Sequence, residues 1–532
     1  MLYWFILWPV LIATLLYLIN ARHLKLMVIL TQFAFLVSSF GLFWKVKTEG
    51  VLTETLGHWP VNIGITLYAD LITAVLIMLT VFLFLMMFIF SYQKLYANKL
   101  FMFLFMLLQG LINGIFLSND LFNLYVLIEV STIVVSILIM FKKDSRSIYD
   151  GMIYLLTNIV AMTFFLFGVG YMYKLFGSLD LTFIAEHIHL VEPKDLILPY
   201  SLLITAVGLK SAIMPLFSWL PRAHGTPSAP SSVSAILSGL YVKGGVYLLI
   251  RLQDTFSTAL DIHELFLIMG FLTGIIGFIL ALSQTDIKLI LAYHTVSQIG
   301  LIVFGLSLNH PYSYWGSIYH ILNHAIFKST LFITAGMIID SYHTRDIRKI
   351  KGVLYKMPLV SFVTLMAFFG ITGAPFFNGS ISKYLIQKGT VGTFYEYGLL
   401  LINLGTIMSF VKYMSIFFGK DEIHPNEKVH SPLNQRVVIF ILGLFCLTGG
   451  VFGTYLIDFF FNQHFEIDPS SYLFKAGVYL LSLIVGILFY RFVYKRIKLF
   501  KKIRSIELSF NGIVFSIVLF FAFVMVYLGI PL

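Results

Sequence analysis

Apolar runs of about 18 or more residues, long enough for an α-helix to cross a bilayer, recur along the whole chain. No segment between these runs is long or polar enough to form a soluble domain. Of the 532 residues, 59% are hydrophobic and 11% are charged, and the mean hydropathy is +0.91. The sequence therefore predicts an all-α polytopic membrane protein, because lipid offers no hydrogen-bond partners to a non-helical backbone.

We expect sixteen transmembrane helices. The first is interpreted as a retained span, because it has neither a basic n-region nor a small-residue cleavage site. The expected spans lie at residues 2–20, 26–45, 62–91, 101–117, 121–141, 152–174, 196–216, 232–250, 265–282, 288–307, 314–339, 358–388 (broken), 397–418, 437–456, 472–491 and 508–529.

Lysine and arginine collect in the loops that follow odd-numbered spans, whereas the loop 177–195, after an even-numbered span, is acidic. By the positive-inside rule, both termini are then outside the cytoplasm. The basic run 491–504 is expected at the anionic cytoplasmic leaflet or against a partner subunit. A solvated connector is the alternative for this run, since charge clusters are common at span ends.

Composition excludes several classes of function. The net charge of +11 does not form a soluble basic patch, so we expect no nucleic-acid partner. The single cysteine, Cys446, lies in an apolar run, so this chain alone holds neither a disulfide nor an iron–sulfur cluster. The sequence also has no Walker or Rossmann glycine loop. We therefore expect no cofactor, and no catalysis on this chain alone.

The segment 205–250 carries a lysine in each apolar half, Lys210 and Lys243, around an interruption. The residues that break the helix there are Pro215, Pro221, Gly225, Pro227 and Pro230. A buried ammonium costs at least about 2.5–3.5 kcal/mol, and a broken helix survives in lipid only where it lines a cavity or packs in protein. The alternative is a re-entrant loop whose lysines snorkel to an interface. A second break, at 370–379, precedes Lys383, and this recurrence suggests an internal repeat with ion sites near the midplane.

Other ionisable groups lie inside the expected spans. Glu129 is alone in mid-span, so it is expected to pair with Lys210, the alternative being a neutral, hydrogen-bonded carboxyl group. His320, His324 and Lys328 follow at i, i+4 and i+8, on one helix face over about 12 Å. This spacing favours a proton relay.

A metal site is the rival interpretation for the two histidines, but no acidic third ligand lies nearby in the sequence, so we expect no metal. His294, with Ser297 and Gln298, continues the polar path or simply bonds to neighbouring helices. Two further groups are expected to be structural: Lys412 snorkels near a span end, and Asp70 packs early in its span.

The sequence resembles the antiporter-like subunits of respiratory complex I and the related large subunits of Mrp-type sodium/proton antiporters and membrane-bound hydrogenases. The resemblance covers roughly residues 60–420. It rests on the strings LYVLIEV, GLKSAIMPLFSWLPRAHGTPSAPSSVSAILSG, LAYHTVSQIG, IYHILNHAIFKSTLF and GAPFFNGSISK. Within the family, a lysine at 383 and the lack of a long lateral helix look most like the D subunit of the Mrp antiporters.

The resemblance implies two inverted five-helix repeats with broken helices 7 and 12. Helices 1–3 then occupy residues 1–95, helices 4–8 residues 96–260, helices 9–13 residues 261–420 and helices 14–16 residues 421–532. The site residues that it implies are the glutamate Glu129, its paired lysine Lys210, the bridging Lys243, the central polar axis of His320, His324 and Lys328, and the exit-side Lys383. Many relatives carry histidine where this chain has Phe217, so His224 is a candidate substitute. Many also carry a small hydroxyl residue where His294 stands.

The expected function is proton translocation as one subunit of a multisubunit Na⁺/H⁺ antiporter in the plasma membrane of a prokaryote. The expected partners are other membrane subunits, the lipid bilayer, H⁺ and Na⁺. The alternative is a proton-pumping subunit of a redox-driven complex, such as an energy-converting hydrogenase or a complex I-like dehydrogenase. A third alternative, a scaffold subunit, is disfavoured because a disused axis has no reason to keep seven costly groups in the bilayer.

Overall fold

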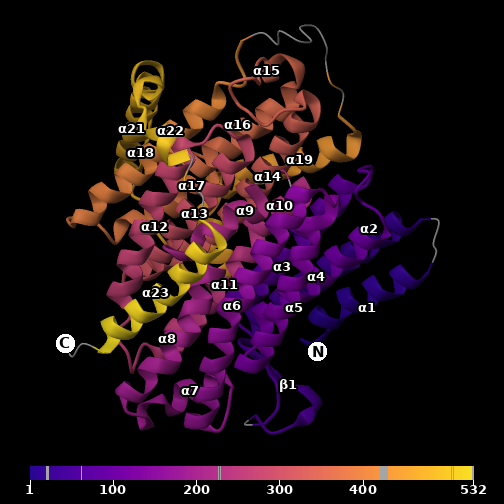
Figure 1. Ribbon diagram of the computed structural model, residues 1–532, viewed down its shortest axis with the longest axis vertical. Coiled ribbons are helices and arrows are strands. Elements are labelled where there is room, and N and C mark those ends of the chain that lie inside the picture. The colour runs from indigo at the N-terminus through magenta and orange to yellow at the C-terminus, as the bar shows by residue number, and fades with distance from the viewer. Residues whose placement is uncertain are drawn as a thin grey trace.

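The computed structural model is a bundle of helices with one small hairpin (Figure 1). It describes residues 1–19, 23–61, 63–225, 227, 229–419, 429, 431–504, 506 and 508–529. The first half comprises α1 (Trp4–Leu18), α2 (Leu24–Glu49), β1 (Leu52–Thr55), β2 (Thr66–Ala69), α3 (Leu71–Ser91), α4 (Lys99–Leu117), α5 (Leu121–Ile139), α6 (Ser145–Phe176), α7 (Leu181–His187), α8 (Pro193–Lys210), α9 (Trp219–Gly225), α10 (Ser231–Ile236), the π-turn η5 (Leu237–Tyr241) and α11 (Val242–Phe256). The second half comprises α12 (His263–Ser283), α13 (Ile287–Leu306), α14 (Pro311–Tyr342), α15 (Val353–Lys356), α16 (Pro358–Thr372), α17 (Asn378–Lys388), α18 (Phe394–Met414), α19 (Leu433–Val451), α20 (Gly453–Phe461), α21 (Pro469–Leu488), α22 (Leu499–Arg504) and α23 (Phe510–Gly529).

Thirteen helical stretches in the described part of the chain are long and apolar enough to cross a membrane. Two shorter apolar helices, α1 and α16, accompany them. The prediction of an all-α polytopic membrane protein is thus confirmed. The count of sixteen spans, the domain boundaries and the inverted repeat stay predictions.

Both predicted helix breaks occur. After α8 the chain turns through Ala212, whose φ is +54°, and resumes as α9 at Trp219. After α16 it turns through Gly373 and Phe376, with φ of +77° and +70°, and resumes as α17. Residues with positive φ end helices because they turn the backbone away from the helical path. Lys210 is therefore the last residue of the helix before the first break.

The expected start of the third span at residue 62 is wrong. The residues before Leu71 form the antiparallel hairpin of β1 and β2, in which Leu52 lies opposite Ala69. Asp70 then caps α3 by accepting a hydrogen bond from the Thr73 amide at 2.8 Å. The apolar residues of the second strand continue the hydrophobic run of α3 towards the N-terminus. The sequence pattern therefore does not mark the start of the helix at Leu71.

Helices α12 and α13 pack backbone against backbone. A Cβ atom built on Gly300 would overlap the Gly274 nitrogen, and one on Gly277 would overlap the Ser297 nitrogen. Only glycine allows such an approach, which is how helices associate closely where lipid supplies no hydrophobic drive. This packing fixes the position of α13, which carries His294 and Gln298.

The substitution Gly300→Ala is expected to destabilise the protein by about 1–3 kcal/mol, because the added methyl group overlaps backbone that cannot move alone. The measurement is the midpoint of thermal unfolding in detergent. Gly170→Ala is the matched control, since a Cβ atom there meets nothing within 4 Å. Equal midpoints for the two variants would refute the close packing.

Candidate proton-relay site

Lys243 lies at the centre of the candidate site. The π-turn η5 widens the helix just before it, and Lys243 Nζ donates a hydrogen bond to the carbonyl oxygen of Ser238 in that turn. The same Nζ lies 2.5 Å from Nδ1 of His324 on α14. Gly239, in the turn, lets α14 approach, since a Cβ atom there would lie 2.5 Å from Ser329 Oγ. Such π-bulges concentrate at functional sites, and this one joins two predicted site residues.

The predicted face of α14 is buried as a unit. His320, His324 and Lys328 all have fully buried side chains. His320 Nδ1 lies 2.8 Å from Ser382 Oγ on α17, and its Nε2 lies 3.1 Å from Gln298 Oε1 on α13. The face therefore connects the centre of the protein to the helix that carries Lys383.

Two further contacts extend the α14 face. Lys328 Nζ donates to the carbonyl oxygen of Leu291 on α13. The rings of His320 and His324 have centroids 6.4 Å apart. Together these contacts line up the three ionisable groups of α14 between α10–α11 on one side and α13 and α17 on the other.

Lys383 lies beyond the second helix break. Its Nζ donates to the carbonyl oxygen of Ile371, in the last turn of α16, at 2.6 Å, and to Asn403 Oδ1 of α18 at 2.8 Å. A cavity of about 540 Å³ reaches this lysine. The polar groups around the cavity include Ser380, Lys383, Lys388, Glu396, Asn403 and Lys475. It opens where α17 ends and α21 begins.

Lys210 and Glu129 lie close together without direct contact. Lys210 Nζ, nearly buried, donates to Thr132 Oγ1 on α5 at 2.6 Å. Glu129, one helical turn before Thr132, is half-buried and within electrostatic range of Lys210. The structure thus brings the predicted partners to one interface, with Thr132 taking the hydrogen bond in place of the expected salt bridge.

The two other candidate histidines are buried without protein hydrogen-bond partners at either ring nitrogen. His224, on α9, meets the ring of Phe332 edge-to-face at 5.1 Å. His294, on α13, stacks on Phe410 at 4.6 Å. Unpaired buried imidazoles are rare, so both remain candidates for the path.

Two lysines behave differently from the sequence prediction. Lys412 does not snorkel, because its Nζ is buried and donates to Leu282 and Gln284 carbonyl oxygens at 2.7 and 2.5 Å, at the end of α12. It caps that helix. Lys288 was missed, because it stands at the expected start of a span, where a lysine usually reaches the headgroups. Its side chain is only 5% exposed.

No group of three or more His, Cys, Asp or Glu residues within the described ranges could hold a metal ion. Lys243 contacts His324, and His320 and the other lysines of the predicted site bind hydroxyl, amide and backbone carbonyl oxygens. The described site is thus a set of basic side chains held by neutral hydrogen-bonding groups.

Comparisons with known proteins agree on the kind of protein. The family described as "NADH:quinone oxidoreductase/Mrp antiporter, TM" matches residues 118–409. The chain is 30% identical to the D subunit of the Na(+)/H(+) antiporter of Alkalihalophilus pseudofirmus, over 80% of this chain and 89% of that protein. It is 28% identical to the D subunit of the Na(+)/H(+) antiporter of Bacillus subtilis, over 88% of this chain and 98% of that protein.

Two solved structures share the fold. A chain of the Mrp complex from Dietzia sp. DQ12-45-1b has a TM-score of 0.78 at 21% identity, with 95% of this chain and 99% of that chain covered. A chain of the membrane-bound sulfane sulfur reductase, an archaeal respiratory membrane complex, also has a TM-score of 0.78, at 22% identity, with 91% and 99% covered.

The cavity at Lys383 is expected to admit water-soluble reagents. Gln387 lines it, so Gln387→Cys should react with a membrane-impermeant maleimide in native membranes. Ile386→Cys is the matched control, because Ile386 is fully buried, and the native Cys446 is also fully buried. Mass spectrometry of the labelled chain gives the readout. Equal labelling at 386 and 387, or none at 387, would contradict an open cavity.

Proposed function

The chain belongs to the family of NADH:quinone oxidoreductase and Mrp antiporter membrane subunits, and on this premise we propose that it translocates protons within a multisubunit Na⁺/H⁺ antiporter. The observation that carries the proposal is the contact of 2.5 Å between Lys243 Nζ and His324 Nδ1, two bases from separate helices that share a hydrogen bond inside the protein. Two nitrogen atoms approach so closely only when one donates an N–H group and the other accepts it with a free lone pair. The pair is therefore suited to proton exchange.

The proposed path runs from the Glu129 and Lys210 pair to Lys243, and then along the face of α14 to His320. Ser382, which contacts His320, is the residue before Lys383, where the cavity of about 540 Å³ begins. Partly buried charges interact by several kcal/mol. The gain or loss of a proton at one lysine is therefore enough to change the proton affinity of the next. His294 is proposed as a side group of this path, since it lies within electrostatic range of Lys328 and Lys383.

We place the chain in the plasma membrane of a prokaryote with both termini outside the cytoplasm. The alternation of basic and base-poor loops supports this orientation. The cavity at Lys383 then opens to the outside, because the loop after α17 follows an even-numbered span. Other membrane subunits are the proposed partners, in line with the names of the relatives as subunits of an antiporter.

A redox-driven assembly is the second candidate. It is favoured by the family description, which includes NADH:quinone oxidoreductase, and by the fold shared with a chain of a respiratory complex. The same side chains would carry protons in either case. Only the energy source would differ, because no redox group is expected on this chain.

Glu129→Ala and Lys210→Ala are each expected to reduce cation-dependent proton transport in everted vesicles to the level of vesicles without the complex. The reason is that each removes one charge of the pair that starts the relay. The matched control is the exposed pair at the start of α8, Glu192→Ala and Lys194→Ala, whose salt bridge of 2.5 Å lies at the surface. Blue-native electrophoresis checks assembly. Full transport in an assembled Lys210→Ala complex would overturn the proposal.

The native complex, extracted in mild detergent, is expected to contain small hydrophobic subunits and no iron–sulfur protein. Mass spectrometry of the co-purified chains tests this, with a mock purification from untagged cells as the control. A nickel–iron or quinone-reducing module among the partners would move the energy source from an ion gradient to electron transfer, in favour of the second candidate.

A further inference from the structure

A second cavity, of about 380 Å³, lies at the opposite end of α14 from the cavity at Lys383. The start of α14 packs beside the end of α17, where Gly389 faces Ser313, whereas Asp340, near the other end of α14, lines the second cavity. The charged groups around this cavity are Lys94, Lys142, Lys288, Asp340 and Arg345. This cavity therefore faces the basic loops, and we call it the basic-side cavity.

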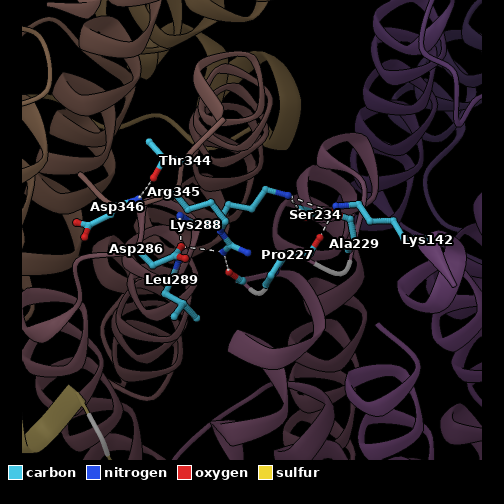
Figure 2. A network of polar contacts seen from close by, with 11 residues as sticks. Lys142, Pro227, Ala229, Ser234, Asp286, Lys288, Leu289, Thr344, Arg345 and Asp346 are labelled. Carbon is cyan, nitrogen blue, oxygen red and sulfur yellow. Dashed lines mark hydrogen bonds and ion pairs between the residues drawn. The ribbon is translucent and has the colours of Figure 1, made fainter. Parts of the chain in front are cut away.

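The cations of this cavity hold one stretch of backbone (Figure 2). Arg345 donates to the carbonyl oxygen of Gly225, Lys142 to that of Pro227 and Lys288 to that of Ala229, the last at 3.1 Å. The nearby carboxylates are already neutralised, since Asp286 pairs with Arg345 at 2.7 Å and Asp340 with Lys94 at 2.7 Å. The lining is thus positive overall.

Among these cations, Lys288 also reaches inward. Its Nζ lies 3.3 Å from Ser234 Oγ on α10. One turn further along the chain, in η5, Ser238 Oγ lies 2.7 Å from Thr295 Oγ1, and the Ser238 carbonyl oxygen accepts a hydrogen bond from Lys243. Thr295 stands on the same face of α13 as Lys288, at i+7. A row of polar groups therefore joins the cavity to the centre of the relay.

His224 lies near both ends of this row. It lies within electrostatic range of Lys288, Lys328 and Lys243. His224 and Lys328 also share one aromatic neighbour, Phe332. The centroid of its ring lies 5.1 Å from that of the imidazole and 5.7 Å from Lys328 Nζ. Both ring nitrogens are buried without protein partners, so each is available to take or give a proton.

We propose that Lys288 is the uptake group of the relay: its ammonium hands a proton through His224 and Ser234 to Lys328 and Lys243, and the neutral amine left behind takes the next proton from the cavity. The proposal rests on the proposed function and extends it. Each step moves one proton from an ammonium or imidazolium to a neutral base, and the Ser234 hydroxyl accepts one proton as it gives up its own, so charge is conserved. The positive lining repels Na⁺, and the row offers amine and imidazole nitrogens instead of the oxygen cage that a hard cation needs. Sodium must then cross elsewhere in the complex.

The test compares Lys288→Gln with Lys288→His in the assembled complex, in everted vesicles. Glutamine keeps a donor for Ala229 and Ser234 but cannot exchange protons at neutral pH, so transport should fall at least about tenfold, which corresponds to a barrier about 1.4 kcal/mol higher. Histidine should restore transport with an optimum at lower pH. Lys349→Gln, an exposed lysine of the same basic side, is the control.

A chemical rescue separates relay from structural support. The Lys288→Cys variant should regain transport after reaction with aminoethyl methanethiosulfonate, which restores an amine, and not after reaction with the uncharged methyl reagent. The native Cys446 is fully buried, so the background is low. Equal activity of Lys288→Gln and the unmodified complex would overturn the inference about Lys288. If Glu129→Ala and Lys210→Ala also kept transport, the proposed function itself would fail.

Discussion

A lysine ammonium inside a membrane protein needs oxygen partners, and in this chain the ends and irregularities of helices supply many of them. The last four carbonyl groups of a helix have no partner within the helix and carry its partial negative charge. Lys383 binds one such carbonyl at Ile371, and Lys412 binds those at the end of α12. Lys243 uses the π-turn in the same way. Helix breaks and buried lysines therefore depend on each other, because removing either leaves the other unpaired.

The kind of partner matters for function. In the described part of the chain, no salt bridge within 4.0 Å involves Lys210, Lys243, Lys328 or Lys383. Carbonyl and hydroxyl oxygens stabilise an ammonium less than a carboxylate does, because they carry no full negative charge. Lys94 and Arg345, at the basic-side cavity, are instead paired with carboxylates. The paired cations hold the structure, and the lysines without a carboxylate partner are the ones that we propose for proton exchange.

Patterns within a few residues of the sequence predicted which residues belong to the candidate site, and they did not predict which of these residues touch one another. Proline and glycine marked both helix breaks, and the i, i+4, i+8 spacing placed the three groups of α14 on one face, because these rules act within a few residues. The contact between Lys243 and His324 joins residues 81 positions apart, and no periodicity encodes it. Thr132 took the hydrogen bond expected of Glu129 for the same reason: which of two neighbours on α5 meets Lys210 depends on how the helices turn. Lys288 was missed because position in a span does not reveal which helices surround it.

The internal repeat stays a prediction, and one contact of the kind that it implies recurs along the chain. Asp120 pairs as an isolated bridge with Asp180, and Asp286 pairs likewise with Asp346, with the same sequence spacing in both. The first bridge adjoins α7 and the second precedes α15, which lie at opposite ends of the bundle (Figure 1). An inverted pair of units gives this arrangement naturally. In the first unit Asp180 accepts from Asn119 at 2.9 Å, whereas in the second its counterpart Asp346 accepts from Arg348 at 2.9 Å. Inversion would thus put the equivalent aspartates on the two faces of the membrane, where they meet different donors.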